Sequence, residues 1–312
     1  MKYIRLIFWL LSVLLVLAVI IAFSMYLNSN TEVNELDEAT RKNAPGSFVQ
    51  LTDGYTHYTL KGPDTGKVVV LVHGFSVPYY IWDSSIAYLS NAGFKVLAYD
   101  EYGRGFSDRP DKEYNADFLR KQLTELLTAL NIKEVEAMAG LSFGGPVIAD
   151  FVANHPDMVK KLIFIDPLYP DAGPADQPGS EFFVRYMMAI NPDKMVAGQL
   201  TDLKYPEKFP TWGDQYKVQM QYKGLRRALV STRFHYATPD AIRENFKALD
   251  SLHKPVLLIW GKEDNTVPFR YSDSLRKAVK TEFLPVDDAG HLPHMEKAGP
   301  VNARIIEFLK AE

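Results

Sequence analysis

Apolar residues along this chain change their spacing at several points, and each spacing predicts a different kind of element. The first apolar run, residues 6–27, contains no charged side chain. As a helix, its 22 residues would rise about 1.5 Å each and span a hydrocarbon core of about 30 Å. This run therefore predicts one N-terminal transmembrane helix.

Later apolar runs are shorter and alternate with helical patterns. Residues 67–72, 94–99 and 161–165 are mostly apolar without strict alternation, as expected of strands buried on both faces. Residues 115–130 carry apolar side chains at helical spacing, and residues 298–309 predict a closing amphipathic helix. Alternation of this kind predicts an α/β fold with a mostly parallel, doubly wound sheet.

The chain before the first buried strand has two parts. Residues 28–46 are polar and acidic, and they predict a tether between the apolar helix and the folded domain. Residues 48–51 and 55–60 alternate like the arms of a β-hairpin around Asp53-Gly54. The folded domain is therefore expected to begin near residue 47.

The alternation of strands and helices stops between residues 167 and 238, a stretch rich in proline, aromatic residues and methionine. A loop of that length without secondary structure is uncommon, so we predict an inserted helical cap. The core would then comprise residues 47–166 and 239–312. Large apolar side chains in the cap would line an acyl pocket, or would simply pack the cap on the core. Three of them are candidates for substrate binding: Phe183, Met187 and Trp212.

Charges around the first apolar run predict its orientation. Lys2 and Arg5 precede it, and the stretch that follows is acidic. Because positive flanks stay in the cytoplasm, residues 1–5 are expected inside, with the domain outside the membrane on a single-pass signal anchor. The alternative is a secreted protein, cleaved at the small-x-small site Ala22-Phe23-Ser24 so that it begins near Met25.

Composition excludes several functions. With 312 residues and 47% hydrophobic content, the chain can form one domain with an insertion. The absence of cysteine excludes disulfides, thiolate metal sites and a cysteine nucleophile. A net charge of −3 with scattered lysine and arginine gives no reason to expect nucleic-acid binding.

The pentapeptide Gly140-Leu141-Ser142-Phe143-Gly144 lies between a strand pattern and a helix pattern. A Gly-x-Ser-x-Gly in this context is a nucleophile elbow, a tight turn that strains the serine backbone and exposes its hydroxyl. The glycines keep Cβ atoms out of the turn. Ser142 is therefore the candidate nucleophile.

Two further residues complete a triad in chain order. Asp264 follows the apolar run 255–260, at the end of a strand where parallel sheets carry their chemistry. His291 follows another short strand pattern. The order Ser…Asp…His differs from both well-known serine protease orders. Asp166, which follows the strand pattern before the cap, is a rival for the acid.

These motifs resemble those of the α/β-hydrolase superfamily, in its lipase, esterase and C–C hydrolase branch, which includes monoacylglycerol lipases. The resemblance also includes His73-Gly74-Phe75, the segment 100–107 and Gly290-His291-Leu292-Pro293, and it spans most of residues 48–310. It implies the α/β-hydrolase fold.

The resemblance also implies a role for each site residue. Ser142 would attack a carbonyl, His291 would act as general base and then general acid, and Asp264 would orient the imidazole. The backbone amides of Phe75 and Phe143 would form the oxyanion hole. Since only the amide of Phe143 would take part, we expect this position to tolerate many side chains.

The other histidines are expected to be structural. His73 precedes the oxyanion-hole turn, and His294 is a weaker alternative to His291 that would face the pocket or cap a helix. The remaining histidines have no motif support: His57, His155, His235 and His253. No pair among these four has the spacing of a metal site, so neither a metal nor a cofactor is expected. Arg104 is expected to shape a turn by bonding nearby carbonyls.

The serine nucleophile argues against epoxide hydrolases and haloalkane dehalogenases, whose nucleophile at this position is aspartate. The aromatic cap and the membrane helix favour an ester with an apolar acyl group, such as a monoacylglycerol or a lysophospholipid. The same triad serves C–C hydrolases, lactonases and aminopeptidases; for an aminopeptidase, Glu181 and Asp214 would hold the substrate ammonium. A non-catalytic hydrolase-like binding protein is the remaining alternative, and the oligomeric state stays open.

Overall fold

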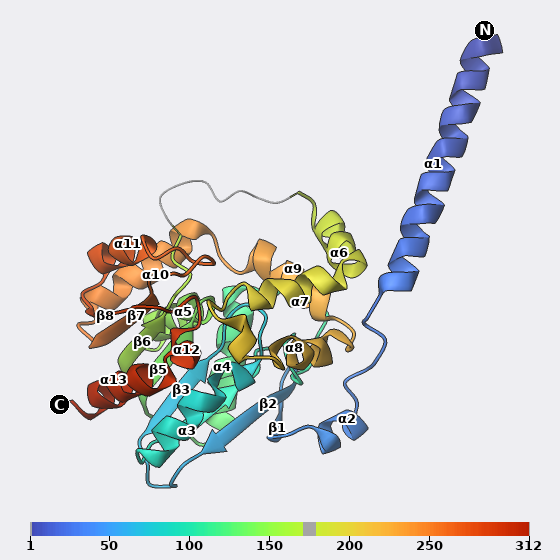
Figure 1. Ribbon diagram of the computed structural model, residues 1–312. Helices are drawn as coiled ribbons and strands as arrows, with labels where there is room; N and C mark the ends of the chain where they lie inside the picture. The colour runs from blue at the N-terminus through green and yellow to red at the C-terminus, as the bar shows by residue number, and fades with distance from the viewer. Residues whose placement is uncertain (1, 171–178, 312) are drawn as a thin grey trace.

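A single mostly parallel sheet organises the part of the chain that the computed structural model describes, residues 2–170 and 179–311 (Figure 1). The strands are β1 (Ser47–Leu51), β2 (Gly54–Lys61), β3 (Val68–Val72), β4 (Lys95–Tyr99), β5 (Val135–Leu141), β6 (Val159–Ile165), β7 (Val256–Gly261) and β8 (Glu282–Val286). Their order across the sheet is β1-β2-β4-β3-β5-β6-β7-β8. β1 and β2 form the expected antiparallel hairpin, β2 pairs antiparallel with β4, and the other strands pair in parallel. The predicted fold class is confirmed.

The helices lie on both faces of this sheet and beyond its edge (Figure 1). Those of the core are η1 (Tyr79–Trp82), α3 (Asp83–Asn91), α4 (Ala116–Ala129), α5 (Gly144–Asn154), α10 (Pro239–Ser251), α11 (Tyr271–Ala278), α12 (Pro293–Glu296) and α13 (Ala298–Lys310). Those before and within the predicted cap are α1 (Lys2–Ser29), α2 (Glu38–Asn43), α6 (Glu181–Ile190), α7 (Pro192–Leu200), η2 (Pro206–Lys208), α8 (Trp212–Met220) and α9 (Leu225–His235).

Alternate side chains of each buried strand belong to two different hydrophobic cores, because successive residues of a strand point to opposite faces of the sheet. Val70 and Val72 of β3 join the core beneath α4, α5, α10 and α11. Val69 and Leu71 of the same strand join the core beneath α3 and α13. The uninterrupted apolar runs of the sequence therefore belong to strands covered on both sides.

The predicted cap segment, residues 167–238, is helical in its described part. Trp212 and Tyr216 of α8 and Leu225 and Leu229 of α9 are buried in the same core as α3 and α13. The segment therefore packs on the sheet domain through large apolar side chains, as a cap would.

α1 extends away from the domain with no buried residue (Figure 1). It is long and apolar enough to cross a membrane, and an 18-residue window within it has a mean hydropathy of 3.1. These are the properties expected of an anchor, and a signal sequence shares them.

The predicted tether, residues 28–46, is docked on the protein rather than extended from it. The amide of Val33 donates to the carbonyl of Gln221 at 2.9 Å, and the amide of Lys223 donates to the carbonyl of Asn34 at 2.9 Å. Glu32 accepts from the amide of Arg226 at 2.7 Å. Polar, acidic composition predicted a tether but not its contacts; these amides and the Glu32 carboxylate hydrogen-bond to the cap.

Candidate active site

Ser142 occupies a strained turn between β5 and α5. Its φ is +51°, in the left-handed region that a side chain rarely adopts. A Cβ on Gly140 would lie 2.4 Å from the carbonyl oxygen of Gly144, and a Cβ on Gly144 would lie 2.5 Å from the carbonyl oxygen of Val72. Only glycine fits both positions, so the sequence motif produces the elbow for steric reasons.

His291 and Asp264 meet across the carboxyl ends of β7 and β8. Nδ1 of His291 lies 2.7 Å from Oδ2 of Asp264, and both side chains are buried. The other carboxylate oxygen of Asp264 accepts from the amides of Thr266 at 2.7 Å and Val267 at 2.9 Å. The carboxylate is therefore held in place by its own turn while it orients the imidazole.

The environment of His291 favours its protonated form. Burial alone would lower the pKa of His291, but the charge and hydrogen bond of Asp264, with the nearby Asp202, outweigh burial and raise it. A base with a raised pKa accepts a proton more readily. This is the property that a general base beside a serine requires.

Asp166, the rival acid, lies beside this pair. One ligand atom each of Asp166, Asp264 and His291 fall within 4.8 Å of one another. Oδ1 of Asp166 accepts from the amide of Gly261 at 2.8 Å, while burial and the charge of Asp264 raise the pKa of Asp166 well above its usual range. A raised pKa favours neutral Asp166, which suits a supporting hydrogen-bonding role beside Asp264.

The two amides expected for an oxyanion hole are available. Within the described part of the chain, the backbone N–H groups of Phe75 and Phe143 donate to no other group. A Cβ on Gly74 would lie 3.4 Å from Cβ of Ser142, so the turn that carries Phe75 passes close to the serine. Free amides beside a candidate nucleophile are the donors that a developing oxyanion needs.

The ring of Phe143 is buried, contrary to the expectation that it would not matter. It packs edge-on against Phe75, with 5.9 Å between ring centroids, and against Tyr236 at 4.6 Å. A smaller side chain would leave a cavity in this cluster. The expected tolerance at Phe143 therefore loses its basis.

Arg104 has the structural role predicted for it. Its buried guanidinium donates to the carbonyls of Phe75 at 3.0 Å and Tyr102 at 3.1 Å, and to Oγ1 of Thr232 at 2.9 Å. Thr232 belongs to α9, so Arg104 connects the turn of Phe75 to the cap. The guanidinium holds the backbone of the turn that carries Phe75, and Arg104 does not line the cavity of Ser142.

A cavity of about 240 Å³ brings Ser142 and His291 together. Val77, Ile81 and Leu292 give it apolar walls, and its lining also includes two polar cap residues, Gln199 and Asp202. The lining is Gly74, Phe75, Ser76, Val77, Ile81, Leu141, Ser142, Gly198, Gln199, Asp202, Thr266, His291 and Leu292. Asp202 was not predicted, because it stands in no motif; it reaches the cavity because its carbonyl accepts from the amide of His291 at 2.8 Å.

The three residues proposed for the acyl pocket lie outside this cavity. Phe183 and Met187 are 57% and 37% exposed and border a depression lined by residues of α6 and α7. Trp212 is buried in the core, edge-on to Tyr80 at 5.5 Å. The sequence predicted the apolar helices, but it did not indicate whether the apolar face of α6 lies toward the cavity of Ser142 or away from it.

His73 and His294 are buried, neutral and held by backbone groups. Nε2 of His73 accepts from the amide of Glu101 at 2.9 Å, and burial lowers the pKa of His73 to about 4. Nε2 of His294 donates to the carbonyl of Ile81 at 3.1 Å, and burial lowers the pKa of His294 to about 3. Neither histidine lines the cavity of Ser142.

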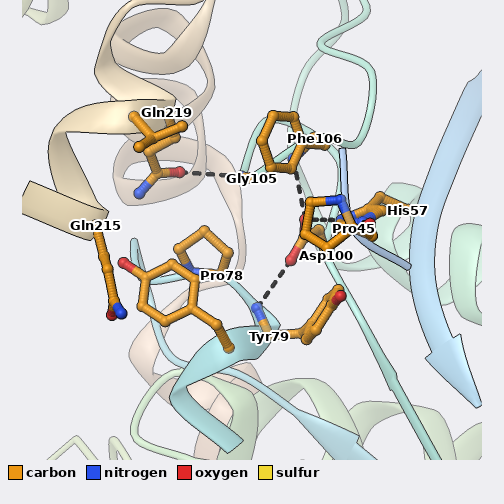
Figure 2. Close-up of a pocket in the computed structure, with 11 residues that line it drawn as sticks. Pro45, His57, Pro78, Tyr79, Asp100, Gly105, Phe106, Gln215 and Gln219 are labelled. Carbon is orange, nitrogen blue, oxygen red and sulfur yellow. Dashed lines mark hydrogen bonds and ion pairs between the residues drawn. The ribbon is translucent and has the colours of Figure 1, made fainter. Parts of the chain in front are cut away.

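A second cavity, of about 310 Å³, lies between the end of the tether, the core and α8. Figure 2 shows Pro45, Pro78, Tyr79 and Phe106 around it, with Gln215 on the side of the cap. It shares no lining residue with the cavity of Ser142.

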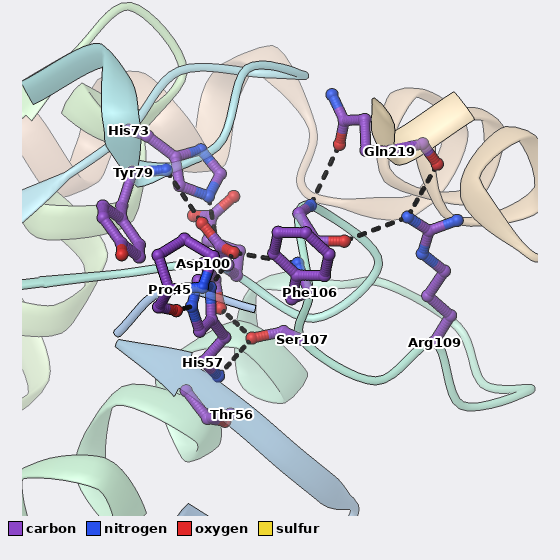
Figure 3. Close-up of polar contacts among 12 residues, drawn as sticks. Pro45, Thr56, His57, His73, Tyr79, Asp100, Phe106, Ser107, Arg109 and Gln219 are labelled. Atoms are coloured by element: carbon purple, nitrogen blue, oxygen red, sulfur yellow. Dashed lines mark hydrogen bonds and ion pairs between the residues drawn. The ribbon is translucent and has the colours of Figure 1, made fainter. Parts of the chain in front are cut away.

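Asp100 is the centre of the polar network beneath this second cavity (Figure 3). Its carboxylate accepts from Nδ1 of His57 at 2.7 Å and from the amides of Tyr79 at 2.8 Å and Phe106 at 3.0 Å. Nε2 of His57 donates to the carbonyl of Pro45. The motif residues 100–107 therefore form a structural turn, as predicted, and the network also fixes the end of the tether.

Comparison with known proteins agrees with this geometry. A sequence model described as the alpha/beta hydrolase fold matches residues 67–298. The chain is 26% identical to the AB hydrolase superfamily protein YfhM of Bacillus subtilis, over 83% of this chain and 96% of that protein. It is 26% identical to the carboxylesterase YbfK of Bacillus subtilis, over 84% of this chain and 86% of that protein. It is also 25% identical to epoxide hydrolase 3 of Xenopus tropicalis, over 82% of this chain and 75% of that protein. Among solved structures, the enol-lactonase of Burkholderia xenovorans superposes with a TM-score of 0.73 at 19% identity, over 85% of this chain and 100% of that one.

Proposed function

The chain belongs to the α/β-hydrolase family, and from this premise we propose that it is a membrane-anchored serine hydrolase that cleaves carboxylic esters with an apolar acyl group. One observation carries the proposal: Ser142 lines the same cavity as His291, whose Nδ1 is 2.7 Å from Asp264. Relatives with other activities share the fold, so the activity is argued from this site.

The reaction would proceed through an acyl-enzyme. His291 takes the proton of Ser142 as the hydroxyl oxygen attacks the ester carbonyl, and Asp264 stabilises the imidazolium. The negative charge that forms on the carbonyl oxygen is stabilised by the amides of Phe75 and Phe143. His291 then donates the proton to the leaving alcohol. A water molecule, deprotonated by the same histidine, releases the acid and regenerates Ser142.

A serine at position 142 also separates this chain from its epoxide hydrolase relatives. Epoxide opening in that branch forms an ester with a carboxylate nucleophile, and the resemblance places that nucleophile at the position of Ser142. A hydroxyl activated by an Asp–His pair suits acyl transfer instead.

The cavity supports an ester with an apolar acyl group of limited size. Its walls include Val77, Ile81 and Leu292, and its volume of about 240 Å³ is small. Pockets for drug-sized ligands usually measure about 300–1,000 Å³. A short or medium acyl chain fits this space, whereas a long-chain monoacylglycerol or lysophospholipid needs the cap to move.

The proposed location is the outer face of a membrane. α1 is 28 residues long, and Lys2 and Arg5 lie at its amino end. Positive residues remain in the cytoplasm, which places the hydrolase domain on the other side. Secretion after cleavage near Met25 is the alternative, and the amino-terminal residue of the mature protein decides between them.

A second candidate substrate class is favoured by Asp202. This half-buried carboxyl lines the cavity of Ser142, whereas Glu181 and Asp214, which were expected to hold an ammonium group, pair with His235 and Lys217 elsewhere on the cap. An ester or amide that carries an ammonium group near its scissile carbonyl would find a carboxylate in Asp202.

The decisive test is hydrolysis of p-nitrophenyl esters, from acetate to palmitate, by the full chain in detergent, with Ser142→Ala as control. We expect a maximum at short or medium chains that is absent in the variant. Labelling of the wild type by a fluorophosphonate, without ester turnover, would move the proposal to C–C, peptide or lactone substrates. Absence of both labelling and turnover in a folded protein would support a binding role.

A further inference from the structure

We propose that α6 contacts lipid: its apolar face is seated among the acyl chains of the bilayer that α1 spans. This inference rests on the anchor in the proposed function, and it adds a second membrane contact, made by the cap. Figure 1 shows α6 beside the carboxyl end of α1, on the side of the domain where α1 leaves it.

The exposed face of α6 is unusual in its chemistry. Phe182 is 80% exposed and Phe183 is 57% exposed, and Met187, one turn later, is 37% exposed. Among the described large hydrophobic residues outside α1, Phe182 has the highest exposed fraction and Phe183 the third highest. Adjacent exposed apolar groups of this kind mark a surface that contacts another apolar phase.

The depth of α6 follows from its contact with α1. The hydroxyl of Tyr186, on α6, donates to the carbonyl of Ala22 at 3.0 Å. Ala22 lies five residues before Leu27, the end of the apolar run, which is about 7.5 Å at 1.5 Å per residue. If α1 spans the bilayer, the hydroxyl of Tyr186 lies at the level of the outer hydrocarbon, and the exposed side chains next to it share that level.

The docked tether holds this arrangement. Glu32 accepts from the amides of Gly224 at 3.1 Å and Arg226 at 2.7 Å, and it forms an ion pair with the guanidinium of Arg226 at 3.3 Å. Asn30, just after α1, also accepts from Arg226 at 2.5 Å. The chain therefore meets the cap immediately after the membrane helix, and the domain cannot tilt freely away from the bilayer.

The space between α1 and α6 suits a lipid. A cavity of about 690 Å³ lies there, lined on the side of α1 by Val19 and Phe23 and on the side of α6 by Phe182 and Arg185. Glu32 and Arg226, which pair with each other, also line this cavity, so Arg185 is the cation of the lining that this ion pair does not include. Apolar walls with such a cation match an acyl chain below a phosphate headgroup. The bilayer itself supplies such molecules, so the occupant we propose is a phospholipid of that leaflet.

The absence of cysteine in the sequence makes a direct test possible. Single-cysteine variants of the full chain would carry an environment-sensitive fluorophore and be reconstituted in phosphatidylcholine nanodiscs, with or without lipids spin-labelled on the acyl chain. Phe182→Cys tests α6, and Leu14→Cys, in the middle of α1, tests the anchor. Tyr88→Cys is the matched control, because Tyr88 is a 42% exposed aromatic residue on α3.

We expect spin-labelled lipid to quench the probes at positions 14 and 182, and to leave the probe at position 88 unchanged. Quenching at 14 without quenching at 182 overturns the contact of α6 and leaves the anchor intact. Quenching at 182 alone would overturn the anchor, and with it the inference that α6 lies in the bilayer that α1 spans. A blue-shifted but unquenched probe at 182 would indicate that a second copy of the chain covers α6, which also overturns the inference.

Discussion

His57 and Asp100 form a second buried histidine–carboxylate pair, with 2.7 Å between Nδ1 and Oδ2, away from the cavity of Ser142. Both ring nitrogens of His57 face acceptors, because Nε2 lies against the carbonyl of Pro45. An imidazole with two acceptors carries two protons. Burial opposes this charge, but Asp100 and the Pro45 carbonyl outweigh burial and raise the pKa of His57.

This pair predicts a pH-dependent stability. The pKa of His57 is raised in the folded state, so its contribution is complete below about pH 6.5 and is lost as pH rises through the folded-state value. His57→Gln should lose about 3–5 kcal/mol of unfolding free energy at pH 6, since Asp100 is left without its cation, and less at pH 9. Thermal denaturation across this range measures the difference. His253→Asn, at an exposed histidine with φ of +51°, is the control; an equal loss at both pH values would contradict the prediction.

The triad predicts a pH profile and an order of effects. Ester hydrolysis needs neutral His291, so kcat/KM should rise with pH through a pKa above 6.5, because the pKa of His291 is raised.

Asp264→Asn should lower kcat roughly 10³- to 10⁴-fold. Asp166→Asn should cost far less, since burial already favours a neutral Asp166. The reverse order, with activity kept in Asp264→Asn, would assign the acid to Asp166.

Sequence motifs predicted the chemical groups because those groups depend on local geometry. Gly140 and Gly144 are required by contacts within the elbow and with β3, so the pattern alone indicates the turn. Asp264 and His291 each follow a strand of the parallel sheet, and such strand ends meet at one edge. The fold and the proximity of Asp264 and His291 could therefore be predicted from the sequence alone.

The lining of the cavity could not be derived in this way. Helical spacing in α6 indicates an apolar face, but the same pattern serves a helix turned toward the core or toward lipid; Phe183 and Met187 face outward. Asp202 reaches the cavity through a bond to the backbone of His291, and no local pattern encodes such a contact. His57 meets Asp100 only because β2 pairs with β4 in one register, with Tyr58 opposite Tyr99.

Glu101 predicts a second loss of stability with rising pH, which arises from a buried carboxyl group instead of a buried imidazole. It is fully buried, and among the described residues neither carboxylate oxygen has a hydrogen-bond partner. Burial raises the pKa of Glu101 to about 8. The folded state therefore holds a proton that the unfolded state releases above about pH 4.3, and stability falls as pH rises toward 8.

Removal of this carboxyl should stabilise the protein in alkaline solution. At pH 5, Glu101→Gln should have an unfolding temperature near that of the wild type, and at pH 9 a higher one. The free energy of unfolding at pH 9 should be larger by a few kcal/mol, since each pKa unit corresponds to about 1.4 kcal/mol. Glu244→Gln, at an exposed carboxylate of α10, should change neither value. A destabilised Glu101→Gln at pH 9 would indicate that the attraction between Glu101 and Arg104 outweighs the burial of the charge.

Asp202 links the cap to the catalytic base, and it provides the sharpest test of substrate class. Its carbonyl accepts from the amide of His291, and its side chain accepts from Oγ1 of Thr266 at 2.5 Å. Burial raises the pKa of Asp202, and its negative charge in turn raises the pKa of His291. Asp202→Asn keeps the backbone bond and the size of the side chain and removes only the charge.

For a neutral p-nitrophenyl ester, Asp202→Asn should therefore keep the plateau value of kcat and move the acidic limb of kcat/KM to lower pH. For an ester with an ammonium group, the variant should lose about tenfold in kcat/KM if the carboxylate binds the cation, a difference of about 1.4 kcal/mol. Asp214→Asn, at an exposed cap carboxylate paired with Lys217, is the matched control. If the ratio of the kcat/KM values for the two esters is the same in Asp202→Asn and the wild type, Asp202 does not bind the ammonium group. The neutral apolar ester then remains as the proposed substrate class, and the only effect of Asp202 is the shift of the acidic limb of the pH profile.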